Sequence, residues 1–116
     1  VCGKTGHKYF LMPPHSFMLG YTNEYFKMPD NVGAVCFGKS TMARLGCIVN
    51  VTPIEPGFHG TVVLELSNTT PNPMRVYADQ GICQFVFHKA SQRPLVTYAD
   101  KSGKYQSQTG LTLAKG

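Results

Sequence analysis

Short runs of β-forming residues alternate with turns along the chain. The clearest run is residues 61–67, in which Val62, Leu64 and Leu66 fall on one face of a strand and Glu65 lies in the middle of the other face. Similar runs predict further strands near residues 9–12, 17–22, 34–38, 47–52, 74–77, 82–88 and 95–98. Turns rich in Gly, Pro and Asn separate the runs, and this regular spacing predicts a sandwich or barrel.

Only one segment has the pattern of a helix. In residues 40–45, Ser40 or Thr41 can cap the start, and Gly46 can end the helix. One short helix among many strands makes the predicted fold class mainly β. A length of 116 residues suits a single domain, which we expect to span residues 1–116.

The composition is that of a packed domain. Apolar residues make up 42% and charged residues 15% of the chain, which argues against disorder. No apolar run has membrane-spanning length, and the first ten residues lack the apolar stretch of a signal peptide, so we expect a cytoplasmic protein with no membrane partner. Three of the four cysteines lie in apolar runs and none forms a C-x-x-C pair, which favours free buried thiols over disulfides.

The charge favours an anionic ligand. The formal net charge is +5, but the basic residues are scattered singly, so a defined phosphate site is preferred over a nucleic-acid surface. Residues 38–44 are the first candidate, with glycine and hydroxyl residues at a helix start beside Lys39 and Arg44. The alternative is a capped surface turn. Residues 33–40 also match the Walker A string, fortuitously, because a turn precedes them and residues 34–37 have the pattern of a strand.

Two further features have chemical potential. A carboxylate in the middle of an apolar strand, as Glu65 is, suits general acid–base work if it is buried, whereas the alternative is a solvated strand face. The polar segment 104–110 suits a lid that closes on a phosphate ligand, whereas the alternative is a frayed terminus. The four histidines lack metal-ligand spacing and the motifs of the zinc nucleobase deaminases are absent, so no zinc of that type is expected.

Taken together, several blocks resemble the dCTP deaminase family, whose fold is shared with the trimeric dUTPases. The resemblance covers nearly the whole chain and rests on residues 38–46 (GKSTMARLG), 48–60 (IVNVTPIEPGFHG), 63–68 (VLELSN), 81–84 (GICQ) and 103–110 (GKYQSQTG), and it extends upstream through 12–17 and 24–29. It implies a distorted β-barrel or jelly-roll subunit of the β-clip type. It also implies a homotrimer with active sites between subunits.

The activity that the resemblance implies is hydrolytic deamination of dCTP to dUTP and ammonia, a hydrolase reaction at the C–N bond of a cyclic amidine, in the supply of dUMP and dTTP precursors. Mg²⁺ would enter with the triphosphate and no zinc would be needed. The partners would be dCTP and other copies of the chain, with dTTP as a candidate regulator and no nucleic acid.

The resemblance also implies residue roles. Glu65 matches the catalytic carboxylate, Ser40 the hydroxyl that holds the attacking water, and Arg44 the neighbouring arginine that stabilises developing charge. The positions that match substrate-binding residues are Lys39, Thr41, Gln84, Tyr98, Lys104 and Gln108 toward the phosphates, Asn50 and Val51 at the base, and Glu55 and Phe58 at the deoxyribose.

Two alternatives remain from the sequence. The first is a dUTPase or a bifunctional deaminase–dUTPase, which Glu55 disfavours because it stands where dUTPases place a shorter catalytic aspartate. The second is a catalytically silent nucleotide-binding trimer, suggested because relatives have a longer N-terminal region.

Overall fold

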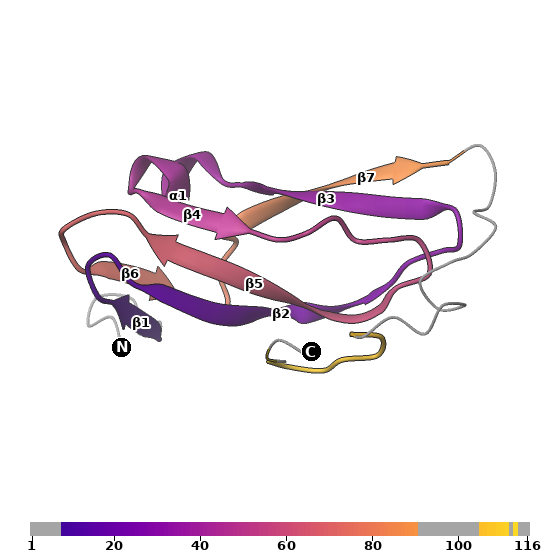
Figure 1. The fold of residues 1–116 in the computed structure, drawn as a ribbon, viewed down its shortest axis with the longest axis horizontal. Coiled ribbons are helices and arrows are strands. Elements are labelled where there is room, and N and C mark those ends of the chain that lie inside the picture. Colours follow the sequence, from indigo (N-terminus) through magenta and orange to yellow (C-terminus); the bar gives the residue numbers. More distant parts are fainter. Residues whose placement is uncertain (1–7, 91–104, 112, 114–116) are drawn as a thin grey trace.

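The computed structural model describes residues 8–90, 105–111 and 113. These residues form antiparallel strands and one short helix, which confirms the mainly-β prediction (Figure 1). In chain order the elements are β1 (Tyr9–Met12), β2 (Phe17–Lys27), β3 (Val32–Gly38), α1 (Ser40–Arg44), β4 (Cys47–Asn50), β5 (His59–Asn68), β6 (Met74–Tyr77) and β7 (Cys83–Lys89).

The strands pair in three antiparallel ladders. One sheet has the order β2-β5-β4, and the two-stranded ladders are β1-β6 and β3-β7. In Figure 1 the β3–β7 ladder runs along the upper side of the three-stranded sheet, and β1, β6 and α1 gather at its left end. The ladders are open within the described residues, as in a dUTPase-like β fold, so these residues alone do not close a barrel.

The core lies on one face of β5. The side chains of Val62, Leu64 and Leu66 are all buried there, which confirms the strand pattern in the sequence. Val62 and Leu64 belong to one core cluster, and Leu66 belongs to a second that contains the buried Met12 and Cys47. Because alternate residues of a strand point to opposite faces, Glu65 faces away from these two clusters.

Strand β2 is longer than the sequence predicts. The sequence predicts a strand over residues 17–22, but it continues to Lys27 across an irregular register between Tyr21 and Tyr25. The Thr22 hydroxyl accepts a hydrogen bond from the Val62 N–H at 3.0 Å and donates to the Glu24 carbonyl at 2.9 Å. A side chain thus substitutes for main-chain pairing, which explains why the prediction failed here.

The helix has five residues and exposes most of its side chains. Its N-cap is Lys39 and no side chain caps it, so the predicted capping by Ser40 or Thr41 is wrong because both lie inside the first turn. The predicted stop is confirmed, because Gly46 adopts a φ of +86° and its N–H donates to the Ala43 carbonyl. Residues 32–38 form β3, as expected if the Walker A match is fortuitous.

Several smaller expectations are also decided. Strand β4 ends at Asn50 rather than at Thr52, while the predicted strand 95–98 lies outside the described residues. Cys36, Cys47 and Cys83 are free thiols, as predicted, and Cys47 is buried. In the part of the chain that the structure describes, no helix has the length and apolar content needed to cross a membrane.

Candidate functional site

Glu65 lies at the centre of the three-stranded sheet. It stands opposite Leu19 on β2 and Asn50 on β4, so these three side chains share the face that points away from the core clusters. Glu65 is half-buried, and among the described residues nothing forms a hydrogen bond with its buried Oε2 atom. A solvated strand face, the alternative that the sequence left open, does not describe this oxygen.

Two thiols pack together on the β3–β7 ladder, and one of them, Cys36, interacts with Glu65. Cys36 stands opposite Phe85, and Cys83 stands opposite Gly38, so the two cysteines are diagonal neighbours on one face of the β3–β7 ladder. Burial raises the pKa of the Cys36 thiol from 9.0 to about 12, with smaller contributions from Cys83 and from the Glu65 carboxylate. Burial likewise raises the pKa of Cys83. Both thiols are therefore protonated at neutral pH, and they add no charge near the carboxylate.

The cationic turn at α1 forms a separate group. The Lys39 Nζ atom donates a hydrogen bond to the Gly81 carbonyl at 3.3 Å, and Lys39, Thr41 and Arg75 line a hollow of about 230 Å³ between α1 and the β6–β7 turn. Ser40 and Arg44 are exposed on the helix. Since Glu65 Oε2 has no hydrogen-bond partner within the described chain, neither of these residues reaches that atom.

The remaining predicted residues are distributed over three regions. Asn50 is exposed beside Glu65, whereas Val51 packs against the core. Glu55 is exposed in the β4–β5 loop, but Phe58 is only 7% exposed and belongs to the core, which leaves little of its ring for a sugar. Gln84 is exposed on β7. Tyr98 and Lys104 lie outside the described residues.

Gln108 is held against the start of β5. Its main chain forms a parallel bridge with Gly60, and its Nε2 atom donates to the Thr61 carbonyl at 2.6 Å. The Thr61 N–H donates in return to the Gln108 carbonyl at 2.8 Å. Residues 105–110 are therefore docked on the domain, and a frayed terminus does not describe them. The Gln108 Oε1 atom is buried and, within the described chain, has no hydrogen-bond partner.

One residue of this segment escaped the sequence analysis. Gln106 forms side-chain hydrogen bonds with Gly57, in the loop before β5, and with His59, the first residue of β5. The signal in the sequence was weak: Lys104, Gln106 and Gln108 alternate along the tail, and only the first and last match positions with roles in the family.

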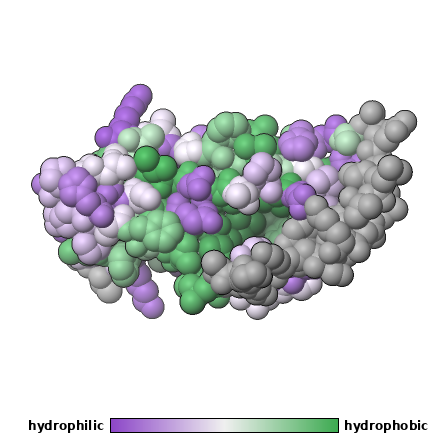
Figure 2. Space-filling view, in the orientation of Figure 1, coloured by the Kyte–Doolittle hydropathy of each residue, from purple (hydrophilic) through white to green (hydrophobic). Residues whose placement is uncertain are grey.

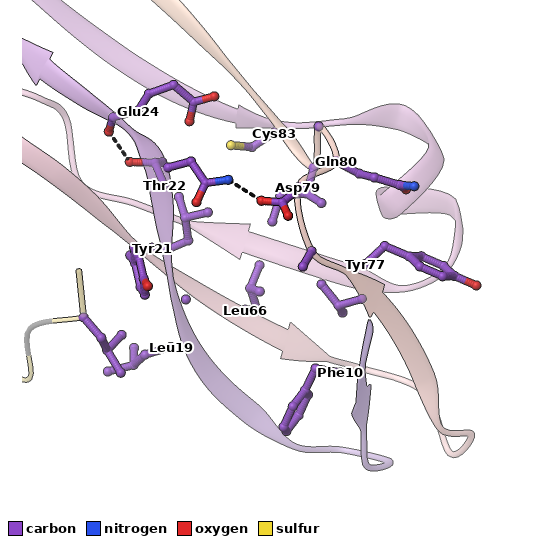
Figure 3. Close-up of a pocket in the computed structure, with 18 of the residues that line it drawn as sticks. Phe10, Leu19, Tyr21, Thr22, Glu24, Leu66, Tyr77, Asp79, Gln80 and Cys83 are labelled. Atoms are coloured by element: carbon purple, nitrogen blue, oxygen red, sulfur yellow. Dashed lines mark hydrogen bonds between the residues drawn. The ribbon is translucent and has the colours of Figure 1, made fainter. Parts of the chain in front are cut away.

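A groove of about 950 Å³ lies between β2, β6 and β7. Figure 2 shows apolar side chains gathered in the middle of the visible face, and Figure 3 shows Leu66, Tyr21 and Phe10 among the residues that line the groove. On β2, Asn23 forms a hydrogen bond with Asp79 from the β6–β7 turn. None of the predicted site residues lines this groove, but Leu19, which stands opposite Glu65 on β2, does.

The open antiparallel ladders, with a half-buried carboxylate on the central strand and a short cationic helix at one end, define a domain of the dUTPase-like β fold. Residues 4–90 match the family described as dCTP deaminase-like. The chain belongs to this family.

Curated relatives support this assignment. Proteins named dCTP deaminase are 56% identical in Erythrobacter litoralis, 58% in Campylobacter concisus and 57% in Campylobacter jejuni, each over 90% of this chain. The chain spans a little over half of their length, 57% of the first and 56% of the other two.

Proposed function

We propose that this protein hydrolyses dCTP to dUTP and ammonia. The observation that supports this most directly is the Glu65 carboxylate, whose Oε2 atom is buried without a partner in the described chain. An unsatisfied buried acceptor costs about 1–3 kcal/mol, so it is retained where a donor is bound during function. Relatives that share more than half of the residues over 90% of this chain are named for this reaction.

In the proposed reaction Glu65 acts as general base and then as general acid. It takes a proton from water as the water oxygen bonds to C4 of the cytosine ring, and it passes that proton to N3. The second proton of the water leaves with the 4-amino group when the C4–N bond breaks, which gives ammonia and a C4 carbonyl. Ser40 orients the water, and the Arg44 guanidinium stabilises the developing negative charge.

We propose that a second copy of the chain completes the site. Within the described residues of one chain, neither Ser40 nor Arg44 forms a hydrogen bond with Glu65 Oε2, although both lie exposed on α1. The sheet face around Glu65 also exposes large apolar side chains, from Phe17, Tyr21 and Ile48, each more than half accessible. An apolar face around a buried acid suits contact with another subunit, and a closed homotrimer is the arrangement that the family resemblance implies.

The triphosphate would be held by cations and backbone rather than by a metal cage. Within the described residues no group of three or more His, Cys, Asp or Glu side chains is placed to hold a metal ion. Mg²⁺ would enter on the phosphate oxygens, which are ligands it prefers. Lys39, Thr41 and Gln84 supply side chains toward the phosphates, while Asn50 and Val51 line the base.

The test is a product assay on the full chain with dCTP and Mg²⁺. We expect equal amounts of ammonia and dUTP, and we expect Glu65→Gln to lower kcat by about 10²–10⁴-fold, the usual contribution of a general base. Glu24→Gln, an exposed carboxylate on β2, is the matched control and should retain activity. Full turnover by Glu65→Gln would refute the mechanism. Nucleotide binding without ammonia release from the unmodified chain would refute the function.

The same assay run with dUTP distinguishes pyrophosphate hydrolysis. Because Glu55 is one methylene longer than the aspartate of dUTPases, we expect no dUMP or pyrophosphate from dUTP at a rate comparable to deamination. Pyrophosphate release at a similar rate would show a bifunctional enzyme instead.

A further inference from the structure

Gln106 joins two segments that the sequence places far apart. Its Oε1 atom accepts a hydrogen bond from the His59 N–H at 2.9 Å, and its Nε2 atom donates to the Gly57 carbonyl at 3.1 Å. The main-chain N–H of His59 can only donate and the Gly57 carbonyl can only accept. The two partners therefore fix which end of the Gln106 amide is the oxygen and which is the nitrogen. One side chain thus holds the tail against the β4–β5 loop.

The loop is also fixed from its other side. The Met28 N–H donates to the Phe58 carbonyl at 2.9 Å, and the Gly57 N–H donates to the Pro29 carbonyl at 3.2 Å. The loop therefore lies between the end of β2 and the tail. A displacement of the tail acts directly on the loop that contains Glu55 and Phe58.

Main-chain pairing continues the contact along β5. The Ser107 N–H donates to the His59 carbonyl, and the Thr61 hydroxyl donates to the carbonyls of Gln108 and Gly110 at 3.3 and 3.2 Å. The approach is close enough to require glycine at position 60, since a Cβ there would lie 2.9 Å from the Gln108 carbonyl oxygen. Residues 57–61 and 105–110 therefore form one hydrogen-bonded unit.

We infer that Gln106 is a positioning residue that couples the sugar-side loop to the phosphate-side tail, so that both engage the nucleotide together. This inference rests on the proposed function, and on the family resemblance for the two sides of the ligand: it implies that the loop with the exposed Glu55 faces the deoxyribose and that Gln108 faces the triphosphate. Gln106 touches neither part of the ligand. Its contribution is to hold the loop where a 2′-hydroxyl finds no room, and thereby to favour dCTP over CTP.

The first test needs no activity. In the full chain, amide hydrogen exchange of His59 and Ser107 should speed up in Gln106→Ala, because one amide loses its acceptor and the other its aligned partner strand. Gln106→Glu keeps an acceptor for the His59 N–H but sets a carboxylate oxygen against the Gly57 carbonyl. The two oxygens repel each other, so exchange of the His59 and Ser107 amides should rise in this variant too. Thr109→Ala, an exposed position in the same segment, is the matched control and should exchange like the unmodified chain.

The second test separates positioning from a structural role. For Gln106→Ala we expect the KM for dCTP to rise about tenfold with kcat within about twofold, as befits the loss of two neutral hydrogen bonds that act on binding. The ratio of kcat/KM for dCTP over CTP should fall by a similar factor. A merely destabilising change would lower both substrates equally and leave this ratio intact.

The outcomes are decisive in each case. Unchanged exchange at His59 and Ser107 in both Gln106 variants, or an unchanged dCTP-to-CTP ratio with either folded variant, overturns the inference. If the unmodified chain releases no ammonia, the proposed function fails on its own. The ratio of dCTP to CTP binding constants by calorimetry then replaces the kinetic ratio, and the same fall or its absence decides the role of Gln106.

Discussion

Two side-chain acceptor atoms of the described residues are buried without a hydrogen-bond partner, Glu65 Oε2 and Gln108 Oε1. Both belong to residues on or directly beside β5, and both match positions that the family resemblance places at the nucleotide. Such atoms lower stability, and natural sequences retain them chiefly where function requires them. At the residue scale, the candidate site is therefore recognised by buried acceptor atoms that lower the stability of the fold.

Cys36 provides a prediction at this scale. Its pKa is raised from 9.0 to about 12 in the folded chain, chiefly by burial. Below pH 9 the thiol is protonated in both the folded and the unfolded chain, so it adds no pH dependence. Above pH 9 the unfolded chain ionises first, so the free energy of unfolding should decrease as the pH rises toward 12.

Chemical denaturation at several pH values measures this effect. Cys36→Ser should flatten the decrease between pH 9 and 11 relative to the unmodified chain. In the native chain, alkylation of Cys36 at pH 8 should be slower than in the unfolded chain by roughly three orders of magnitude, because the thiolate is the reacting form and the raised pKa lowers its fraction by that factor. Equal rates in the two states would contradict the raised pKa.

At the scale of elements, the irregular segments are held by side chains that replace main-chain partners. Thr22 does so within β2, and Asn68 does so at the end of β5. The Asn68 side chain is 2% exposed, and its Nδ2 atom donates to the carbonyls of Met12, Pro13 and Asn72. One amide thereby joins the β1–β2 turn to the turn after β5.

Replacing Asn68 tests this joint. Asn68→Ala leaves several buried carbonyls without donors, and we expect it to lower the free energy of unfolding by about 2–4 kcal/mol. Asn72→Ala removes only an exposed side chain of the same type and should change it by less than about 0.5 kcal/mol. Denaturant titration of the two variants makes the comparison, and equal stability would show that the Asn68 network adds little.

At the scale of the whole molecule, the proposed catalytic groups are divided between two parts of one chain. Glu65 lies on the central strand of the sheet, and Arg44 lies exposed on α1, without contact to Glu65 Oε2. The outward apolar side chains around Glu65 suit burial in an assembly. A site built from two copies reconciles this separation with the chemistry that deamination requires.

Mixing inactive subunits tests the assembly. Glu65→Gln and Arg44→Ala should each be inactive alone, but their mixture after dissociation and reassembly should regain activity. In random trimers about a quarter of the sites would combine an intact Glu65 with an intact Arg44 from a neighbour. Native mass determination gives the oligomeric state in parallel. A mixture that stays inactive while the subunits demonstrably exchange would place both residues in one chain's site.

Much of the fold follows from local patterns. The burial of Val62, Leu64 and Leu66, the helix end at Gly46 and the bounds of β1 and β6 agree with the sequence-based expectations. The misses have a common cause. Strand β2 was cut short at Thr22, whose hydroxyl pairs with Val62, forty positions along the chain. The helix start at Ser40 is right, but the cap was misassigned because a hydroxyl in the first turn resembles a capping residue.

The sequence by itself determined the strand periodicity, the position of a carboxylate in an apolar strand and the family to which the chain belongs, because these depend on spacing along the chain. Only the tertiary structure decided that Phe58 is buried, that Glu65 Oε2 has no partner among the described residues, and that Gln106 reaches Gly57 in the loop before β5. Contacts of that kind depend on how distant segments meet. Local spacing sets the direction of a side chain, but the packing of other strands decides what stands in front of it.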